Sequence, residues 1–139
     1  MGEVRASVML ENGDDRSLAR RGALAAAEVR RIEADLLVDT GAVLILLPQD
    51  MVEALGLGAM DKVVVTLAND QKVEMPMAGP LVLTAVGRTM HTDCLVGPPR
   101  CEPLLGQVAL ERLDLIVDPT KCQLTVRPES PFLPSVKAK

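Results

Sequence analysis

Short apolar runs of about four to eight residues recur along the chain, separated by turn-forming residues. Runs of this length that are rich in β-branched residues, or that alternate with polar ones, are typical of β-strands. The pattern predicts seven or eight short strands, in segments 4–10, 28–38, 62–67, 72–77, 81–86, 89–96, 115–117 and 123–126. We therefore expect a mainly β domain whose sheet is closed, or nearly closed, into a barrel.

Two segments have helical spacing instead of alternation. Residues 48–55 place Met51, Val52 and Leu55 on one face of a helix, and residues 107–113 repeat this spacing. Each helix follows an apolar stretch and a turn, so the chain contains a weak internal duplication. The region after the first strand is less regular: residues 12–15, Asn-Gly-Asp-Asp, predict a turn, and residues 18–27 are rich in helix formers.

Prolines mark two boundaries. Pro76 indicates the edge or the end of a strand, because proline has no N–H to donate. The three prolines of residues 128–139 predict an extended tail that is mobile unless it packs on a partner. We therefore divide the chain into a domain of residues 1–127 and a proline-rich C-terminal tail of residues 128–139.

Composition narrows the possible partners. The 139 residues suffice for one domain with a core, and 48% hydrophobic residues argue against a disordered chain. Phe132 is the only aromatic residue, so recognition of nucleic acid by stacked aromatic rings is nearly excluded. The net charge of −4 also argues against a phosphate-binding surface. We expect no nucleic-acid partner.

The sequence also bears on location and on metal chemistry. No apolar run approaches the roughly 20 residues of a membrane helix, and the first residues lack the layout of a secretory signal, so we expect a cytoplasmic protein without membrane contact. Cys94, Cys101 and Cys122 have no metal-type spacing and predict reduced, buried thiols, with a Cys94–Cys101 disulfide as the alternative. His91, the only histidine, predicts a solvent-facing strand residue, and we expect neither a metal site nor a cofactor.

The most informative stretch is residues 36–42, Leu-Leu-Val-Asp-Thr-Gly-Ala, which brings one carboxylate into a sharp turn between apolar segments. A charged side chain in apolar surroundings is rarely buried without a partner, so Asp39 needs a specific role. Thr40 offers a hydroxyl, and Gly41 permits close backbone approach. The simplest interpretation is an Asx-type turn, in which the carboxylate accepts nearby backbone N–H groups.

Asp-Thr-Gly-Ala after an aliphatic strand resembles the active-site motif of aspartic proteases. The single copy at residues 39–42 is most similar to the retroviral-type (retropepsin-like) proteases, in particular their small bacterial and archaeal members. Three further elements follow in the family's order: the helix of residues 48–57, Leu-Ala-Asn-Asp at residues 67–70 where the family has its flap hairpin, and Leu-Leu-Gly at residues 104–106. The resemblance implies a closed six-to-eight-strand acid-protease barrel with two short helices, and a strand or an inserted loop upstream of Glu28.

This resemblance implies an activity and a partner. Peptide hydrolysis by carboxylates needs two of them sharing one proton, because one acts as a base while the other acts as an acid. The chain has one Asp-Thr-Gly, so the second carboxylate is expected from Asp39 of another chain in a twofold homodimer. Thr40 is then expected to brace the two turns, and Gly41 to direct its N–H to the carboxylate.

The expected substrate is an extended peptide or protein segment, bound mostly through its main chain beneath the flap hairpin. The residues expected to contact or support it are Ala42, Leu67, Ala68, Asn69, Asp70, Gln71, Leu104, Leu105 and Gly106. The simpler interpretation of residues 67–71 is an ordinary exposed hairpin. The simpler interpretation of residues 104–106 is a core strand followed by the start of a helix.

Three positions depart from the family. Retroviral members often have an acidic residue after the Ala and an Arg after the second Gly, where this chain has Val43 and Gln107, and many relatives have Ser or Thr in place of Ile45. These changes motivate an alternative function, a catalytically inactive peptide-binding or assembly module. The resemblance also implies dimerisation through strands of the two termini. The apolar candidates there are Val4, Val8, Leu124 and Val126, with Phe132 and Leu133 as additions.

Overall fold

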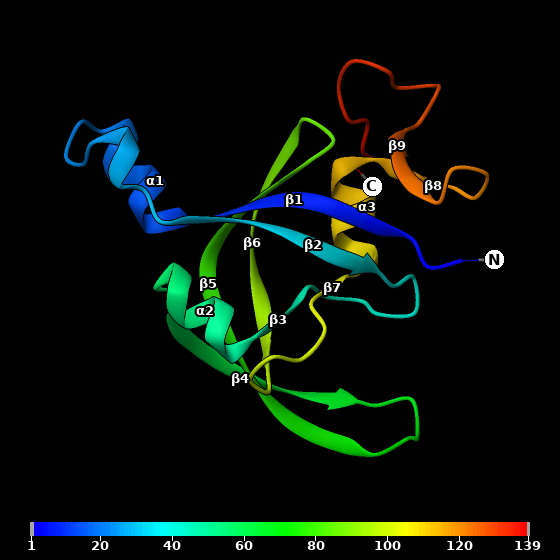
Figure 1. Ribbon diagram of the computed structural model, residues 1–139, viewed down its shortest axis with the longest axis horizontal. Helices are drawn as coiled ribbons and strands as arrows, with labels where there is room; N and C mark the ends of the chain where they lie inside the picture. The colour runs from blue at the N-terminus through cyan, green and yellow to red at the C-terminus, as the bar shows by residue number, and fades with distance from the viewer. Residues whose placement is uncertain (1, 139) are drawn as a thin grey trace.

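Nine strands and three α-helices make up the part of the chain that this computed structural model describes, residues 2–138 (Figure 1). In chain order they are β1 (Arg5–Asn12), α1 (Gly13–Arg20), β2 (Arg31–Val38), β3 (Leu46–Pro48), α2 (Gln49–Leu55), β4 (Gly58–Thr66), β5 (Lys72–Ala85), β6 (Arg88–Gly97), β7 (Leu104–Leu105), α3 (Gln107–Leu113), β8 (Leu115–Asp118) and β9 (Gln123–Val126). A short 3-10 helix, η1 (Ala26–Glu28), precedes β2.

Seven of the strands form one sheet, in the order β1-β2-β7-β3-β6-β5-β4. The sheet closes on itself because β1 also pairs with β5, from Val8 opposite Ala85 to Asn12 opposite Leu81. Strand β4 lies outside this ring, and β8 pairs with β9 in a separate sheet. The predicted fold class, a mainly β closed barrel, is confirmed, and α1 is a third helix beyond the two that the sequence predicts.

The core fills the barrel with aliphatic side chains. Strand β1 shows why the sequence folds this way, because Ala6, Val8 and Leu10 are buried while Ser7 between them is exposed. The largest fully buried side chains are Leu10, Leu36, Leu47, Leu55, Leu81, Leu83, Leu105 and Leu113. The core is built without aromatic residues, as the composition predicts.

The predicted turn at residues 12–15 is wrong, because these residues begin helix α1. The side chain of Asn12 accepts a hydrogen bond from Asp15 N at 3.0 Å, as a helix N-cap does. Its Nδ2 also donates to Leu55 O at 2.9 Å, which ties α1 to the end of α2. The polar residues that favour turns are also the residues that favour N-caps, so the local pattern alone did not separate the two.

The predicted strands at residues 72–77 and 81–86 are one strand, β5. A register shift between Ala78 and Leu81 lets the strand bend and continue past two prolines. Pro76 lies opposite Lys62 of β4, and pairing with β6 begins only at Met77. The prediction that Pro76 marks an edge is therefore correct, whereas a strand end at Pro76 is not.

The C-terminal segment packs on its own domain. The carboxylate of Asp114 accepts hydrogen bonds from Arg127 Nε at 2.9 Å, from Ser135 N at 3.0 Å and from Ser130 Oγ. The buried guanidinium of Arg88 donates to the carbonyls of Leu113 and Asp114, both at 2.9 Å, and to Ser130 O. The tail that the sequence predicts to be mobile is thus bonded at two points, while the domain boundary at residue 127 stays a prediction.

All three cysteines are free thiols, so the alternative Cys94–Cys101 disulfide is absent from the structure. Burial raises the pKa of the Cys94 thiol to about 12, which keeps it protonated. Cys101 and Cys122 are half-buried rather than buried. Within residues 2–138, none of the helices has the length and apolar character needed to cross a membrane; the cytoplasmic location stays a prediction.

Candidate active site

Asp39 begins the loop that connects β2 to β3, and strand β7 lies between these two strands. Leu37 and Val38 of β2 pair in parallel with Leu104 and Leu105 of β7. Asp39 N continues this ladder by donating to Leu105 O at 3.0 Å. The Leu-Leu pair therefore fixes the position at which the chain leaves β2 and turns.

The turn itself is closed by the carboxylate. Gly41 N donates to Asp39 Oδ1 at 2.9 Å, and Ala42 N donates to Asp39 O at 3.1 Å. A side chain at Gly41 would place its Cβ 3.2 Å from the same oxygen, so glycine gives this contact the room it needs. The Asx-type turn is thus present, with the Gly41 N–H directed to the carboxylate.

Gly106 lies directly behind the turn. A Cβ at this position would lie 2.6 Å from Leu44 O and 2.8 Å from Ala42 O, which no side chain tolerates without a backbone shift. Helix α3 begins here, and Gln107 N donates to Ala42 O at 2.8 Å. The Leu-Leu-Gly segment therefore packs directly against the Asp39 turn.

The outer side of the turn is open to solvent. Asp39 is half-buried, and Thr40 and Gly41 are exposed. Val43 is 61% exposed and Val108, at the start of α3, is 40% exposed. In the described residues 2–138, Asp39 has no hydrogen bond to a second carboxylate, and its Gly41 contact is its one side-chain hydrogen bond. One chain thus presents a single carboxylate beside an apolar surface.

The expected flap is the β4–β5 hairpin, which projects from the barrel on the side away from the C-terminus (Figure 1). At its tip, Leu67 N donates to Gln71 O at 2.8 Å and Asp70 N donates to Leu67 O at 2.9 Å. The side chain of Asn69 accepts from Gln71 N at 3.0 Å. All tip residues are exposed, including Ala68. The tip is thus an ordered turn with exposed side chains.

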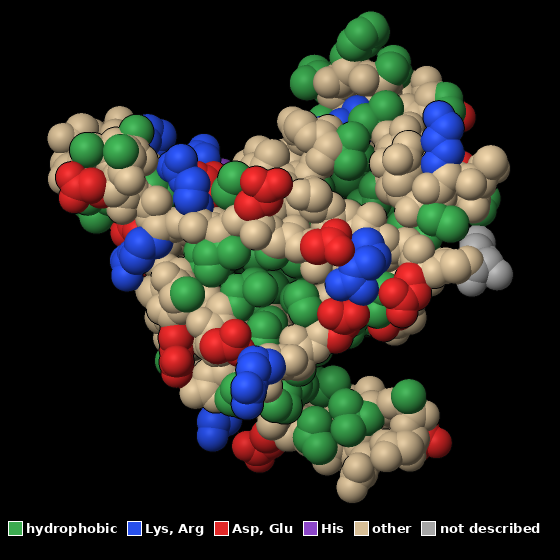
Figure 2. Space-filling model, viewed as in Figure 1, with side chains coloured by type: hydrophobic (Ala, Val, Ile, Leu, Met, Phe, Trp, Pro, Cys, Tyr) green, Lys and Arg blue, Asp and Glu red, His purple; other side chains and the backbone are tan. Residues whose placement is uncertain are grey.

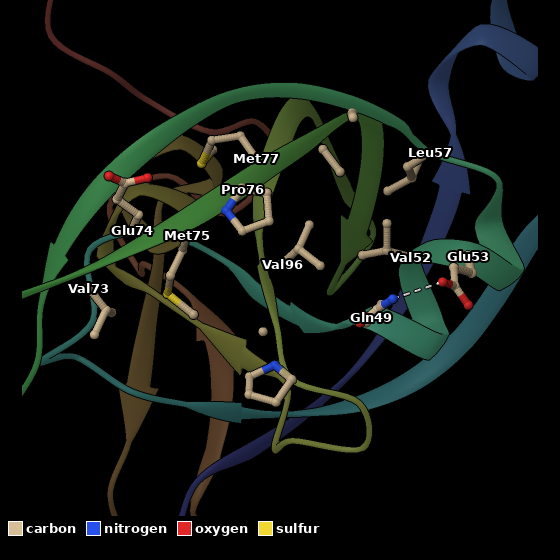
Figure 3. Close-up of a pocket in the computed structure, with 14 residues that line it drawn as sticks. Gln49, Val52, Glu53, Leu57, Val73, Glu74, Met75, Pro76, Met77 and Val96 are labelled. Atoms are coloured by element: carbon tan, nitrogen blue, oxygen red, sulfur yellow. Dashed lines mark hydrogen bonds between the residues drawn. The ribbon is translucent and has the colours of Figure 1, made fainter.

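A groove lies at the base of this hairpin, and the sequence analysis missed it. Its volume is about 610 Å³, and it lies between α2, β5 and the end of β6 (Figure 3). Its apolar lining includes Val52, Leu57, Met75, Met77, Val96 and Pro98. Figure 2 shows hydrophobic side chains gathered in the hollow between the hairpin and the body of the molecule. The alternation of β5 and the apolar face of α2 carried a signal, but only the fold brings them together.

The predicted site residues thus fall into two groups. Asp39, Ala42 and the segment 104–106 are in contact with one another, while the tip 67–71 lies on the projecting hairpin. None of these residues lines the groove. His91 is exposed on β6. Within the described residues, the structure contains no group of three or more His, Cys, Asp or Glu side chains able to hold a metal ion.

Comparison with known proteins supports the fold and goes no further. No model of a protein family matches the chain, and no curated protein matches it. Among solved structures, the protease of EIAV, in complex with the inhibitor HBY-793, is similar with a TM-score of 0.55 and 18% sequence identity. The match covers 81% of this chain and 88% of the EIAV chain. The chain therefore has a retropepsin-like fold.

Proposed function

We propose that this chain is one subunit of a homodimeric aspartic endopeptidase, in which Asp39 from each copy forms the catalytic pair. The observation that carries the proposal is the Asp39 turn. Its carboxylate is oriented by Gly41 N, the turn is supported from behind by Leu105 and Gly106, and its outer side is open. The turn occurs in a chain with a retropepsin-like fold.

The chemistry needs both copies of Asp39. The ionised carboxylate takes a proton from a water molecule, whose oxygen then attacks the scissile carbonyl carbon. The protonated carboxyl of the other copy donates a hydrogen bond to the carbonyl oxygen and so stabilises the developing charge. The C–N bond breaks after a proton has passed to the leaving amine. A single chain offers one carboxylate, so the proposal requires the twofold dimer.

The surrounding residues take the roles that their positions allow. Thr40 is exposed next to the carboxylate, where it can meet its symmetry mate across the twofold axis. Ala42 has a small side chain and leaves room for substrate backbone. The hairpin tip around Asn69 can close over an extended peptide and exclude water. The substrate adds its main-chain hydrogen bonds in the manner of an extra strand.

Two measurements test the proposal together. Sedimentation equilibrium over a range of concentrations should show a dimer, and the dimer should cleave members of a library of unfolded peptides. Asp39→Asn should lower cleavage by about 10²–10⁴-fold, because the pair loses its general base. It should keep the dimer, because amide and carboxylate have nearly the same shape. Asp14→Asn, which changes an exposed aspartate of α1, is the matched control and should cleave as the wild type does. Cleavage by the Asp39→Asn variant at the wild-type rate would contradict the mechanism. Cleavage by a protein that is strictly monomeric would contradict it as well.

A non-catalytic module is the second candidate, and the surface beside Asp39 favours it. Val43 is largely exposed, and Gln107 is exposed as well, in positions where retroviral members often have an ion pair. A dimer that binds extended peptides without cleaving any of the library would support this candidate. Cleavage that depends on Asp39 would exclude it.

A further inference from the structure

A loop near the C-terminus is closed at its base and apolar at its tip. Residues 131–134, Pro-Phe-Leu-Pro, form this loop, which we call the hook. The residues that flank it, Ser130 and Ser135, both donate hydrogen bonds to Oδ2 of Asp114. Arg88 adds a further bond to Ser130 O. Buried polar groups thus hold both ends of the hook to the domain.

The tip of the hook is exposed, with its apolar side chains left largely uncovered by residues 2–138. Phe132 is 91% exposed and Leu133 is 77% exposed. Large apolar side chains that project together from a surface are typical of binding sites, and aromatic residues are frequent among the residues that dominate binding energy. A loop that is already ordered also loses less conformational entropy on binding than a free tail does. The hook therefore has the features of an insertion element.

The groove at the base of the β4–β5 hairpin is complementary to the hook in size, in apolar character and in charge. Its volume of about 610 Å³ and its lining by Val52, Met75 and Val96 suit two apolar side chains. Its charged lining residues are Glu53 and Glu74, both exposed and neither in an ion pair within residues 2–138.

The chain that follows the hook is basic, with lysines at positions 137 and 139. Opposite charges at the rim of an apolar contact favour encounter and fix its orientation. In Figure 1 the C-terminal loop that contains the hook extends beyond β9 and α3, at the opposite end of the molecule from α2 and the base of the β4–β5 hairpin, which supply residues that line the groove. A hook that is anchored to Asp114 therefore does not reach the groove of its own chain.

We propose that the hook of one copy inserts Phe132 and Leu133 into the hairpin-base groove of a second copy. The contact joins unlike surfaces, so it closes into a pair only when two copies exchange hooks, and otherwise links further copies. It uses neither Asp39 nor the turn around it. Docking at the base of the hairpin restrains the movement of β5 relative to α2, which gives self-association a direct way to control access to the barrel surface beneath the hairpin.

Photo-cross-linking of the full chain tests this contact. Phe132 is replaced by p-benzoylphenylalanine, which its exposure makes harmless to the fold. Equal amounts of ¹⁴N- and ¹⁵N-labelled protein are mixed, irradiated and digested, so that mass spectrometry separates cross-links between chains from those within one chain. We expect cross-links between chains at Met75, Met77 or Val96. Cross-links only within a chain, cross-links to β8, β9 or α3 of another chain, or none at all would overturn the proposal.

Charge variants provide the second arm. Glu74→Lys should lower the yield of cross-links between chains by about fivefold, because it reverses a carboxylate at the rim of the groove. Glu28→Lys, the same change on exposed η1 away from the groove, should leave the yield unchanged. Equal yields for the two variants count against the groove. Asp39→Asn should cross-link as the wild type does, so loss of protease activity and loss of hook docking are separate results.

Discussion

Two aspartates in this chain have opposite surroundings. Asp114 is buried, and its carboxylate accepts hydrogen bonds from two side chains and one backbone N–H. Asp39 is half-buried in an exposed turn, and its carboxylate accepts one hydrogen bond, from Gly41 N. Both follow directly after an element of secondary structure, Asp39 after β2 and Asp114 after α3. The difference lies in what remains for the carboxylate to bind.

This difference separates a structural carboxylate from one that is open to chemistry. A carboxylate has about four acceptor positions. At Asp114, protein donors occupy most of them and connect the C-terminal segment to the domain. At Asp39, most of the acceptor positions are left for water, substrate or a second carboxylate. The same residue type therefore anchors the C-terminal segment at Asp114 and keeps open acceptor positions at Asp39.

The largest expected effect comes from making the same substitution in both regions. Under the proposed function, Asp39→Asn should lower peptide cleavage by about 10²–10⁴-fold, because the pair loses its general base, with little change in the temperature of unfolding. Asp114→Asn should do the reverse and lower the unfolding temperature by several degrees, because an amide places an N–H where Ser135 N already donates. Activity per folded molecule and differential scanning calorimetry measure the two. If both variants lowered the stability equally, Asp39 and Asp114 would not differ in their structural role.

The second prediction tests the anchor without touching Asp114. Arg88→Met removes the donor to three carbonyls, those of Leu113, Asp114 and Ser130, and leaves them buried. The free energy of unfolding should fall by about 3 kcal/mol, and carboxypeptidase should remove residues beyond 130 faster. Urea unfolding gives the first value. Arg88→Lys keeps one charged donor and should recover part of the loss; a loss for Met below about 0.5 kcal/mol would mean that the anchor contributes little.

The third prediction tests whether Gly106 gives the exposed Asp39 turn a rigid support. Gly106→Ala forces Cβ to within 2.6 Å of Leu44 O, so the backbone of the Asp39 loop must move. We expect a loss of about 1–3 kcal/mol in stability and a loss of cleavage together. Gly58→Ala is the matched control, since its nearest neighbour lies at 3.6 Å and its φ is negative. If Gly106→Ala cleaved normally, the position of the turn would not depend on the close approach of Gly106.

The sequence predicted the Asp39 region well because its signals are local. Four residues define the turn, and the partner segment at 104–106 consists of one short apolar pair and a glycine whose close approach to Ala42 needs that residue type. The barrel followed from alternation, as in β1, where burial has a period of two. The site residues could therefore be named, although their catalytic roles stay proposals.

The anchor and the groove were missed because their residues come from distant parts of the chain. Arg88 follows a turn between two strands and, in the sequence, looks like an exposed turn residue; only the fold directs it to Ser130, 42 residues away. Asp114 follows helix α3, and nothing in the surrounding sequence indicates that it anchors the C-terminal segment. The groove combines the apolar face of α2 with one face of β5; each has a local pattern, but nothing in the sequence indicates that the two faces meet. Long-range contacts between polar residues leave no periodic pattern to follow.

The smallest expected effect is a dependence on pH that belongs to the anchor. Hydrogen bonds from Ser130, then from Arg127 and from Ser135 N, lower the pKa of Asp114 from 3.8 to about 2. The folded-state pKa lies below the unfolded one, so the stabilisation is complete above about pH 4 and is lost as the pH falls towards 2. Bonds with Arg30 and Arg5 also lower the pKa of Asp15 and of Glu102, so the wild-type curve alone does not isolate Asp114.

Comparing the stability of the wild type with that of Asp114→Asn isolates the contribution of Asp114. The variant has no ionisable group at position 114, so the difference between the urea midpoints of wild type and variant should be constant from pH 7 to about pH 4 and should shrink steadily below that. A difference that stays constant to the lowest pH at which both proteins fold would mean that the Asp114 carboxylate has an ordinary pKa, and that packing of the C-terminal segment rather than charge holds it to the domain. The hook would then depend on packing at its base, and protonation would leave it in place.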